Sequence, residues 1–338
     1  MNASLKNESE MKLAQKKTFK LVMLPPQSAV YLEWGAKVQE QNPNISLLQP
    51  KGLPEALEMI QDADAAFGFM PKELLANAGR LKWLQAPQIA PPAGFYYKEL
   101  IEHPVVVTNF REIFNDHIGA HIMAFVLAFS RGLHYYLPQQ IQQKYKPRPL
   151  DTGVVHLPEA SALIVGVGGI GCEAARLCKA FGMHVAGVDP RRTSLTEGLD
   201  ELFTPDQLDN LLPKYDFVIM TIPHTPQTEG LIDERRLGLM KKTGFLINIG
   251  RGMTVRLDDL VKALEKGQIA GAALDVFEIE PLPNDHPLWT APNILITPHT
   301  AGYGPYLDDR RLNILLDNCN RFARGKPLRN IVDKQFWF

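Results

Sequence analysis

The chain has 338 residues, of which 45% are hydrophobic and 22% are charged, with a formal net charge of −1. This composition is typical of a soluble globular protein, and the length favours two domains. It excludes a general electrostatic attraction to nucleic acid or to an anionic membrane, and no apolar run is long enough for a transmembrane span. The three cysteines lack metal-site spacing, which favours a reducing, cytoplasmic compartment and no metal.

Residues 1–18 are rich in Lys, Glu, Asn and Ser and lack the apolar stretch of a secretion signal. We therefore expect an unstructured tail. Short apolar runs bounded by turn residues then predict the first strands, with helices between them. These runs cover residues 19–24, 63–70, 81–85 and 104–108. Together they predict a small α/β unit.

The stretch 113–137 is the most apolar part of the chain. A helix that is apolar around its whole circumference cannot face water on any side. It is too short to cross a membrane, so we expect it to be buried between domains, between subunits, or both. A homodimer is the prediction that follows.

A second α/β unit begins after a proline-containing loop at residues 145–159. Helical patterns such as 169–181 and 257–266 alternate with short apolar runs, which predicts a doubly wound parallel sheet. Its predicted strands cover residues 162–165, 184–188, 217–220, 245–248, 270–274 and 294–297. A final amphipathic helix at 307–324 is expected to return the chain to the first domain.

The segment 166–171, Gly-Val-Gly-Gly-Ile-Gly, follows a predicted strand and opens a predicted helix. Its glycines permit a tight turn, a close approach to a pyrophosphate and close helix packing, and the helix N-terminus favours an anion. Asp189 ends the next strand, where a carboxylate suits the ribose hydroxyls of NAD. Arg191 and Arg192 follow it and are able to pair with a phosphate. We therefore expect NAD and leave NADP use open.

Three later strand ends carry Arg251, Glu280 and His299. Alone, each is equally well explained by a salt bridge or by packing. Together they supply what reduction of a 2-oxo acid requires. A histidine protonates the carbonyl oxygen, a carboxylate favours its charged form, and a guanidinium binds the substrate carboxylate.

The order of these motifs, GxGxxG, Asp, Arg-Gly, Asp-Val-Phe…Glu-Pro and Thr-Pro-His, resembles the D-2-hydroxyacid dehydrogenase family, including its glyoxylate/hydroxypyruvate reductases. The resemblance implies two Rossmann-like domains. A doubly wound parallel-sheet NAD domain, residues 109–302, is inserted into a flavodoxin-like substrate domain, residues 19–108 plus 303–338. It also implies a dimer built on the helix after Asn109.

The resemblance further implies hydride transfer from NADH to a small 2-oxo acid, with His299 as acid/base, Glu280 as its partner and Arg251 orienting the substrate. Substrate contacts are expected from Ile89, Ala90, Arg251 and His299. The implied cofactor contacts are Gly166, Gly168, Gly169, Ile170, Gly171, Asp189, Ile222, Pro223, Gly250, Arg251, Asp275 and His299.

Two features depart from the family pattern. Pro91 and Pro92 occupy a loop whose backbone N–H groups bind the substrate carboxylate in relatives, and proline has no N–H. Either carboxylate binding depends more on Arg251, Ile89 and Ala90, or the loop is shifted and Gly94 takes part. His121 stands where relatives commonly carry an acid. With His117 it has metal-ligand spacing but no third ligand, so we interpret it as a buried, hydrogen-bonded histidine.

Two alternatives stay open. A phosphorylated hydroxyacid substrate requires a basic cluster, for which the first domain offers only Arg80, Lys82 and Arg111. A nucleotide-sensing interaction protein, like the corepressors that share this fold, requires a partner groove or long tails. The N-terminal tail is the candidate for that role.

Overall fold

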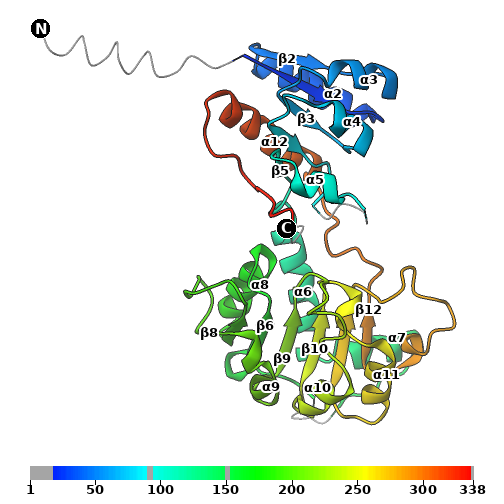
Figure 1. The fold of residues 1–338 in the computed structure, drawn as a ribbon. Helices are drawn as coiled ribbons and strands as arrows, with labels where there is room; N and C mark the ends of the chain where they lie inside the picture. Colours follow the sequence, from blue (N-terminus) through cyan, green and yellow to red (C-terminus); the bar gives the residue numbers. More distant parts are fainter. Residues whose placement is uncertain (1–17, 90–93, 149–152, 336–338) are drawn as a thin grey trace, which may run out of the picture. The chain divides into compact units, whose positions relative to one another are not determined.

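The computed structural model describes residues 18–89, 94–148 and 153–335. Ala90, Pro91 and Pro92, and residues 1–17 of the predicted tail, lie outside these ranges. The chain divides into two compact units (Figure 1). One contains the described residues up to Ile113 together with those from Tyr306 onward, and the other is Phe114–Pro305.

The first unit contains a five-stranded parallel sheet in the order β2-β1-β3-β4-β5. This is the flavodoxin-like order, so the predicted fold is confirmed. The edge strand β2 was not predicted. The strands are β1 (Phe19–Met23), β2 (Ile45–Leu48), β3 (Ala65–Phe67), β4 (Trp83–Gln85) and β5 (Val106–Thr108), and the helices are α2 (Ala29–Gln41), α3 (Leu53–Met59), α4 (Lys72–Asn77), α5 (Lys98–Glu102) and α12 (Leu307–Ala323).

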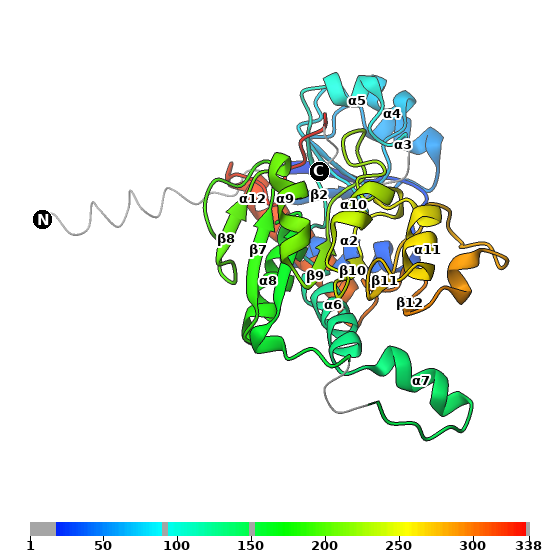
Figure 2. The ribbon, with the colours of Figure 1, turned by 90° about the horizontal axis from the view of Figure 1, so that it is seen from below.

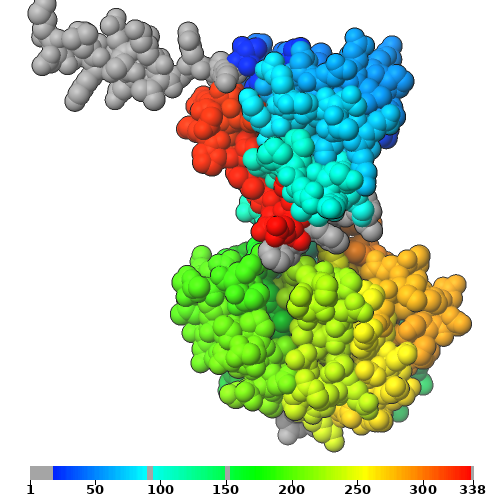
Figure 3. Space-filling model, viewed as in Figure 1, coloured from blue at the N-terminus to red at the C-terminus, as the bar shows by residue number. Residues whose placement is uncertain are grey.

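The C-terminal part of the chain completes the first unit. Phe322 of α12 packs against Phe19 of β1, with ring centroids 4.8 Å apart, and against Trp83 of β4 at 5.5 Å. Beyond α12, Ile331 forms an antiparallel bridge with Thr108 at the end of β5. Figure 3 shows these red C-terminal residues against the blue and cyan ones.

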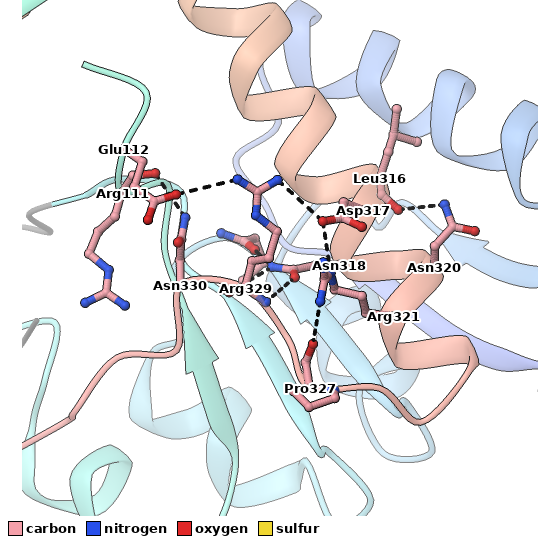
Figure 4. Close-up of polar contacts among 11 residues, drawn as sticks. Arg111, Glu112, Leu316, Asp317, Asn318, Asn320, Arg321, Pro327, Arg329 and Asn330 are labelled. Carbon is pink, nitrogen blue, oxygen red and sulfur yellow. Dashed lines mark hydrogen bonds and ion pairs between the residues drawn. The ribbon is translucent and has the colours of Figure 1, made fainter. Parts of the chain in front are cut away.

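A polar network ties this C-terminal segment to α12 and to the end of β5 (Figure 4). The fully buried Asn318 accepts a hydrogen bond from the Arg329 backbone at 2.7 Å, and the Arg329 side chain pairs with Asp317 at 3.4 Å and Glu112 at 3.5 Å. Asn330 donates to the Arg111 carbonyl at 3.0 Å. These bonds keep the residues just after β5 in the first unit. The first unit therefore extends to Ile113. The sequence had predicted that it ends with β5, at residue 108.

The second unit contains a seven-stranded parallel sheet in the order β12-β11-β10-β9-β6-β7-β8. The predicted doubly wound sheet is confirmed, with an additional edge strand, β8. The strands are β6 (Ser161–Val165), β7 (His184–Val188), β8 (Glu201–Phe203), β9 (Phe217–Met220), β10 (Phe245–Asn248), β11 (Gly271–Leu274) and β12 (Ile294–Ile296). The strand order reverses between β6 and β9, and ligands of such sheets bind outside the carboxyl ends at this point.

Helices cover both faces of this sheet. Alternate strand residues point to opposite faces, so Phe217 and Ile219 join one apolar core while Val218 joins the other. The first core includes α6 and α8, and the second includes α9, α10 and α11. Their bounds are α6 (Asn115–Ser130), α8 (Gly169–Ala180), α9 (Leu208–Leu211), α10 (Glu234–Leu239) and α11 (Leu257–Glu265).

The prediction of one buried helix over 113–137 is wrong. Two helices, α6 and α7 (Leu133–Ile141), are separated at Gly132, whose φ of +70° interrupts the helix. The apolar side of α6 is buried, but Leu137 and Ile141 of α7 are 48% and 83% exposed in this single chain. Figure 2 shows α7 projecting from the rest of its unit. Across the described ranges, no helix has the length and apolarity needed to cross a bilayer.

Candidate functional site

The glycine loop after β6 has the geometry of a dinucleotide site. Gly166 has a φ of +98°, which glycine adopts without strain. A Cβ at Gly171 would lie 2.0 Å from the Gly166 carbonyl oxygen, so the first turn of α8 packs tightly on the loop. A Cβ at Gly168 would meet no atom within 4 Å, which leaves that backbone open to a ligand. With Gly169 and Ile170 in the first turn of α8, these residues fit a pyrophosphate at a helix N-terminus.

Ile222, after β9, brings three loops together. A Cβ at Gly166 would lie 2.7 Å from Ile222 Cγ2, and a Cβ at Gly250 would lie 2.6 Å from the Ile222 carbonyl oxygen. The loops after β6, β9 and β10 therefore meet beside the predicted Ile222-Pro223 turn. Thr221 donates its hydroxyl to the Gly166 carbonyl at 2.5 Å, a contact that no motif in the sequence indicates.

Asp189 ends β7 and is held beside the glycine loop. One carboxylate oxygen accepts from the Val167 backbone at 2.9 Å, and the other accepts from the Arg191 backbone at 2.9 Å. The Arg192 side chain donates to Cys172 Sγ at 3.1 Å and contacts the Val167 carbonyl. Oδ1 also accepts from the Arg192 backbone at 3.2 Å, so Oδ2 is the oxygen that keeps a further lone pair for a ribose hydroxyl.

Arg251 is fixed by the loop after β10. Its carbonyl accepts hydrogen bonds from the buried Asn248 at 3.1 Å and from the buried Thr254 hydroxyl at 2.7 Å. A Cβ at Gly252 would lie 1.9 Å from the Phe277 carbonyl oxygen, so this loop packs closely on the one that carries Glu280. Burial lowers the pKa of Arg251 while Glu280 opposes that shift, and an arginine remains charged at neutral pH.

Glu280 and His299 form a hydrogen-bonded pair. Glu280 Oε2 lies 2.6 Å from His299 Nδ1, and its other oxygen accepts from the Phe277 backbone at 2.9 Å. The two side chains are 35% and 53% exposed, so a substrate can reach the imidazole. The motif order alone did not establish this contact, because the two residues lie on loops after different strands.

Asp275 organises the loop that carries His299. Its buried carboxylate accepts from the Thr300 and Ala301 backbone N–H groups, each at 2.9 Å, and its carbonyl accepts from the His299 backbone at 2.8 Å. His299 has a φ of +55°, an uncommon conformation for a residue other than glycine. Such strain persists only where surrounding bonds determine it, and it is concentrated at functional sites.

The predicted substrate contact Ile89 belongs to the first unit, whereas the other described site residues belong to the second. The Ile89 carbonyl accepts from the Asn109 side chain at 3.2 Å. Gly94 has a φ of +86°. Ala90, Pro91 and Pro92 lie outside the described residues, so their predicted effect on carboxylate binding stays a prediction.

The predicted hydrogen bond of His121 is confirmed, but the side chain is half-buried, at 21% exposure, rather than buried. Its Nε2 lies 2.9 Å from Thr297 Oγ1. Burial lowers the pKa of His121, and Asp275 opposes that shift. Within residues 18–89, 94–148 and 153–335, no group of three or more His, Cys, Asp or Glu side chains is arranged to hold a metal ion.

Comparison with known proteins shows to which family this chain belongs. The family model for the NAD-binding domain of D-isomer specific 2-hydroxyacid dehydrogenases matches residues 123–301. A glyoxylate reductase from Thermofilum pendens is 31% identical over 296 residues, which cover 85% of this chain and 86% of that protein. The chain belongs to the D-isomer specific 2-hydroxyacid dehydrogenase family. It is therefore an oxidoreductase with an NAD-binding domain.

Solved structures of the dehydrogenase family share both units of the fold. A member from Aeromonas salmonicida is 30% identical, with a TM-score of 0.73, and the match covers 94% of this chain and 100% of that one. A member from Xanthobacter autotrophicus, solved with NADPH and MES, is 24% identical, with a TM-score of 0.79 and coverage of 95% and 100%. At that identity the second match supports the fold alone.

Proposed function

We propose that the protein reduces a small 2-oxo acid of the glyoxylate or hydroxypyruvate class to the corresponding 2-hydroxy acid, using NADH. His299 is the acid, Glu280 its partner and Arg251 the group that binds the substrate carboxylate. The observation that carries this proposal is the 2.6 Å pair between Glu280 and His299, on a histidine held at a φ of +55°. A structural salt bridge does not require a strained, solvent-accessible imidazole.

The bound dinucleotide supplies a hydride to C2 of the substrate. The protein must then protonate the carbonyl oxygen at the moment negative charge develops on it. Because His299 Nδ1 faces Glu280, Nε2 is the ring nitrogen that donates this proton. The Glu280 carboxylate fixes the ring orientation, and the bond from the Phe277 backbone fixes the carboxylate itself.

Arg251 has a different task. A planar guanidinium binds a carboxylate through two parallel hydrogen bonds and also polarises the neighbouring carbonyl. Asn248 and Thr254 bond to the Arg251 carbonyl, and Gly252 packs on Phe277, so the backbone from which this side chain extends is held on both sides. The remaining site contacts, from Gly166 to Asp275, are proposed to bind the dinucleotide.

NADH is the proposed coenzyme because Asp189 stands fixed beside the glycine loop, where a carboxylate repels the 2′-phosphate of NADPH. The Arg192 guanidinium lies across the same loop and is the group that would tolerate that phosphate. We therefore expect a preference for NADH with residual use of NADPH. The three cysteines are unpaired, which supports a cytoplasmic location.

The test is a substrate panel run with NADH and with NADPH. Glyoxylate, hydroxypyruvate, pyruvate and phenylpyruvate are each added to the purified protein while absorbance at the nicotinamide band is followed. We expect the highest kcat/KM for glyoxylate or hydroxypyruvate with NADH. Tight NADH binding, measured by fluorescence, with no turnover of any 2-oxo acid would contradict the proposal and favour a nucleotide-sensing protein.

A phosphorylated substrate is not supported by the basic residues of the first unit. Arg80 and Lys82 both pair with Asp64, at 3.3 and 3.9 Å, and Arg111 donates to the Ile331 carbonyl at 2.8 Å. A phosphate would have to displace these contacts.

We also propose that the protein is a homodimer in which α7 contacts the second copy. Leu133, Leu137 and Ile141 repeat at a spacing of four residues, so they share one face of the helix, and all are exposed in the single chain. Isolated exposed leucines are ordinary, but an apolar row on a projecting helix is typical of a surface that a partner covers.

Replacing both Leu137 and Ile141 with aspartate is expected to convert the dimer to a monomer, because two charges would be buried at the proposed interface. Size-exclusion chromatography with light scattering measures the mass. The control is Leu32→Asp, at a leucine of α2 that is 49% exposed, which should leave the mass unchanged. A wild-type protein that is already monomeric at micromolar concentration would exclude this dimer.

A further inference from the structure

His121 lies on α6 and reaches the loop that leads from β12 to His299. Its Nε2 lies 2.9 Å from Thr297 Oγ1, and the edge of its ring packs against Phe125 with centroids 4.7 Å apart. Its side chain is 21% exposed. The proposed mechanism gives His121 no role, although it contacts the segment that holds the acid.

The direction of these hydrogen bonds follows from chemistry. Thr297 donates its hydroxyl to Asp275 Oδ1 at 2.6 Å, and a hydroxyl has one proton to give. The Thr297 oxygen must therefore accept from His121, which places a proton on Nε2. Asp275 in turn accepts from the Thr300 and Ala301 backbones, the two residues that follow His299.

We propose that His121 is a positioning residue for the reaction. His121 fixes the Thr297 hydroxyl, and this hydroxyl fixes the Asp275 carboxylate. The carboxylate in turn holds the loop in the conformation that presents His299. This inference rests on the proposed function, in which His299 is the acid. It adds to that function a residue that acts through Thr297 and Asp275.

A neutral histidine is suited to this position. Nε2 lies 3.8 Å from Asp275 Oδ1, so a permanent charge here would compete with the backbone N–H groups for that carboxylate. Burial lowers the pKa of His121, which favours the neutral ring that donates one hydrogen bond.

The same helix also packs against the far end of the loop. His117 lies one turn before His121 on α6, and a Cβ at Gly304 would lie 2.3 Å from His117 Cε1. Residues four apart share one face of a helix. The two histidines of α6 therefore contact the loop on both sides of His299, at Thr297 and at Gly304.

The test compares four variants, each with kcat, KM, the Kd for NADH and Tm measured. His121→Leu keeps the side-chain volume but removes the hydrogen-bond donor. It is expected to lower kcat by about tenfold, the effect of one misplaced hydrogen bond. The Kd for NADH should change by less than about twofold. His121→Gln keeps an N–H near Nε2 and should restore kcat to within about threefold of wild type. Thr297→Val should match His121→Leu.

The double variant His121→Leu/Thr297→Val should lose no more activity than either single variant, because both remove the same chain of bonds. His156→Leu, at a histidine whose side chain is 69% exposed, is the control for loss of a histidine and should leave kcat unchanged. Full kcat in His121→Leu would overturn the proposal. So would a glutamine variant as slow as the leucine variant at equal Tm, or additive losses in the double variant.

A second readout does not depend on activity. Long-range ¹H–¹⁵N spectra of protein labelled at histidine report which ring nitrogen carries the proton. We expect the His121 signal, identified by its loss in His121→Leu, to show the Nε2–H form, and the Nδ1–H form would overturn the proposal. Turnover in His299→Ala would instead show that the proposed function has failed, whatever the state of His121.

Discussion

Replacing His299 with alanine is expected to lower kcat for 2-oxo acid reduction by about 10³-fold, the central range for loss of a general acid. The imidazole is the group that neutralises the alkoxide as it forms, and Glu280, 2.6 Å from its Nδ1, orients the ring so that Nε2 supplies the proton. Steady-state oxidation of NADH with glyoxylate or hydroxypyruvate measures this loss. The side chain is 53% exposed, so the fold should survive the change.

The pH dependence of the two reaction directions tests the same role for His299. Reduction requires the protonated ring and oxidation requires the neutral one, so raising the pH should slow reduction and accelerate oxidation in the wild type. In the alanine variant, the rates of reduction and oxidation should no longer respond to pH in opposite directions. Its Kd for NADH and its Tm should stay near those of the wild type, which separates a chemical defect from unfolding. Undiminished turnover would remove His299 from the mechanism.

The two parallel sheets could be predicted because their inner strands are buried on both faces. β6, β9 and β10 are therefore continuous apolar runs flanked by turn residues. The edge strands β2 and β8 were missed for the same physical reason. Only one residue of β2 is buried and none of β8, and neither strand has more than two consecutive apolar residues. Their pairing is a tertiary property, supplied by the neighbouring strand.

The division between α6 and α7 shows another limit of sequence reasoning. Apolar residues continue from α6 into α7, but Arg131 and Gly132 between them form a helix-end signal that the prediction overlooked. Gly132, at a φ of +70°, turns the chain so that the second apolar stretch leaves the core. The sequence therefore predicted that this stretch is buried within one chain, whereas the structure leaves its leucine and isoleucine side chains exposed. We propose that a second copy covers them.

In the site, the sequence indicated residues that lie in motifs and missed those that act through contacts between distant segments. Arg251, Glu280 and His299 follow strand ends in a recognisable order. His121 and Thr297 are separated by 176 positions, and neither carries a local signal for their hydrogen bond. Asn248 and Thr254 likewise gain their role only where the loop after β10 folds back on the Arg251 carbonyl.

Replacing Arg251 with lysine is expected to lower kcat/KM for the 2-oxo acid by about 10²-fold, and replacement with glutamine by about 10³-fold. Lysine keeps a positive charge but loses the planar fork that grips a carboxylate through two bonds, so much of its loss should be in KM. Glutamine removes the charge that polarises the carbonyl, so kcat should fall as well. Initial rates over a range of substrate concentration at saturating NADH separate the two effects.

Arg256→Lys provides the matched control, because Arg256 lies on the same segment but pairs with Glu278 at 3.3 Å and Glu229 at 3.6 Å, at a side chain that is 44% exposed. Exposed pairs contribute little, so its kinetics and Tm should match those of the wild type. If Arg251→Lys also matched, the substrate carboxylate would have to be bound by other groups, with the loop of Ile89 as the first candidate. If both Arg251 variants lose activity while Arg256→Lys does not, the planar guanidinium after β10 is what distinguishes a 2-oxo acid from any other carbonyl compound.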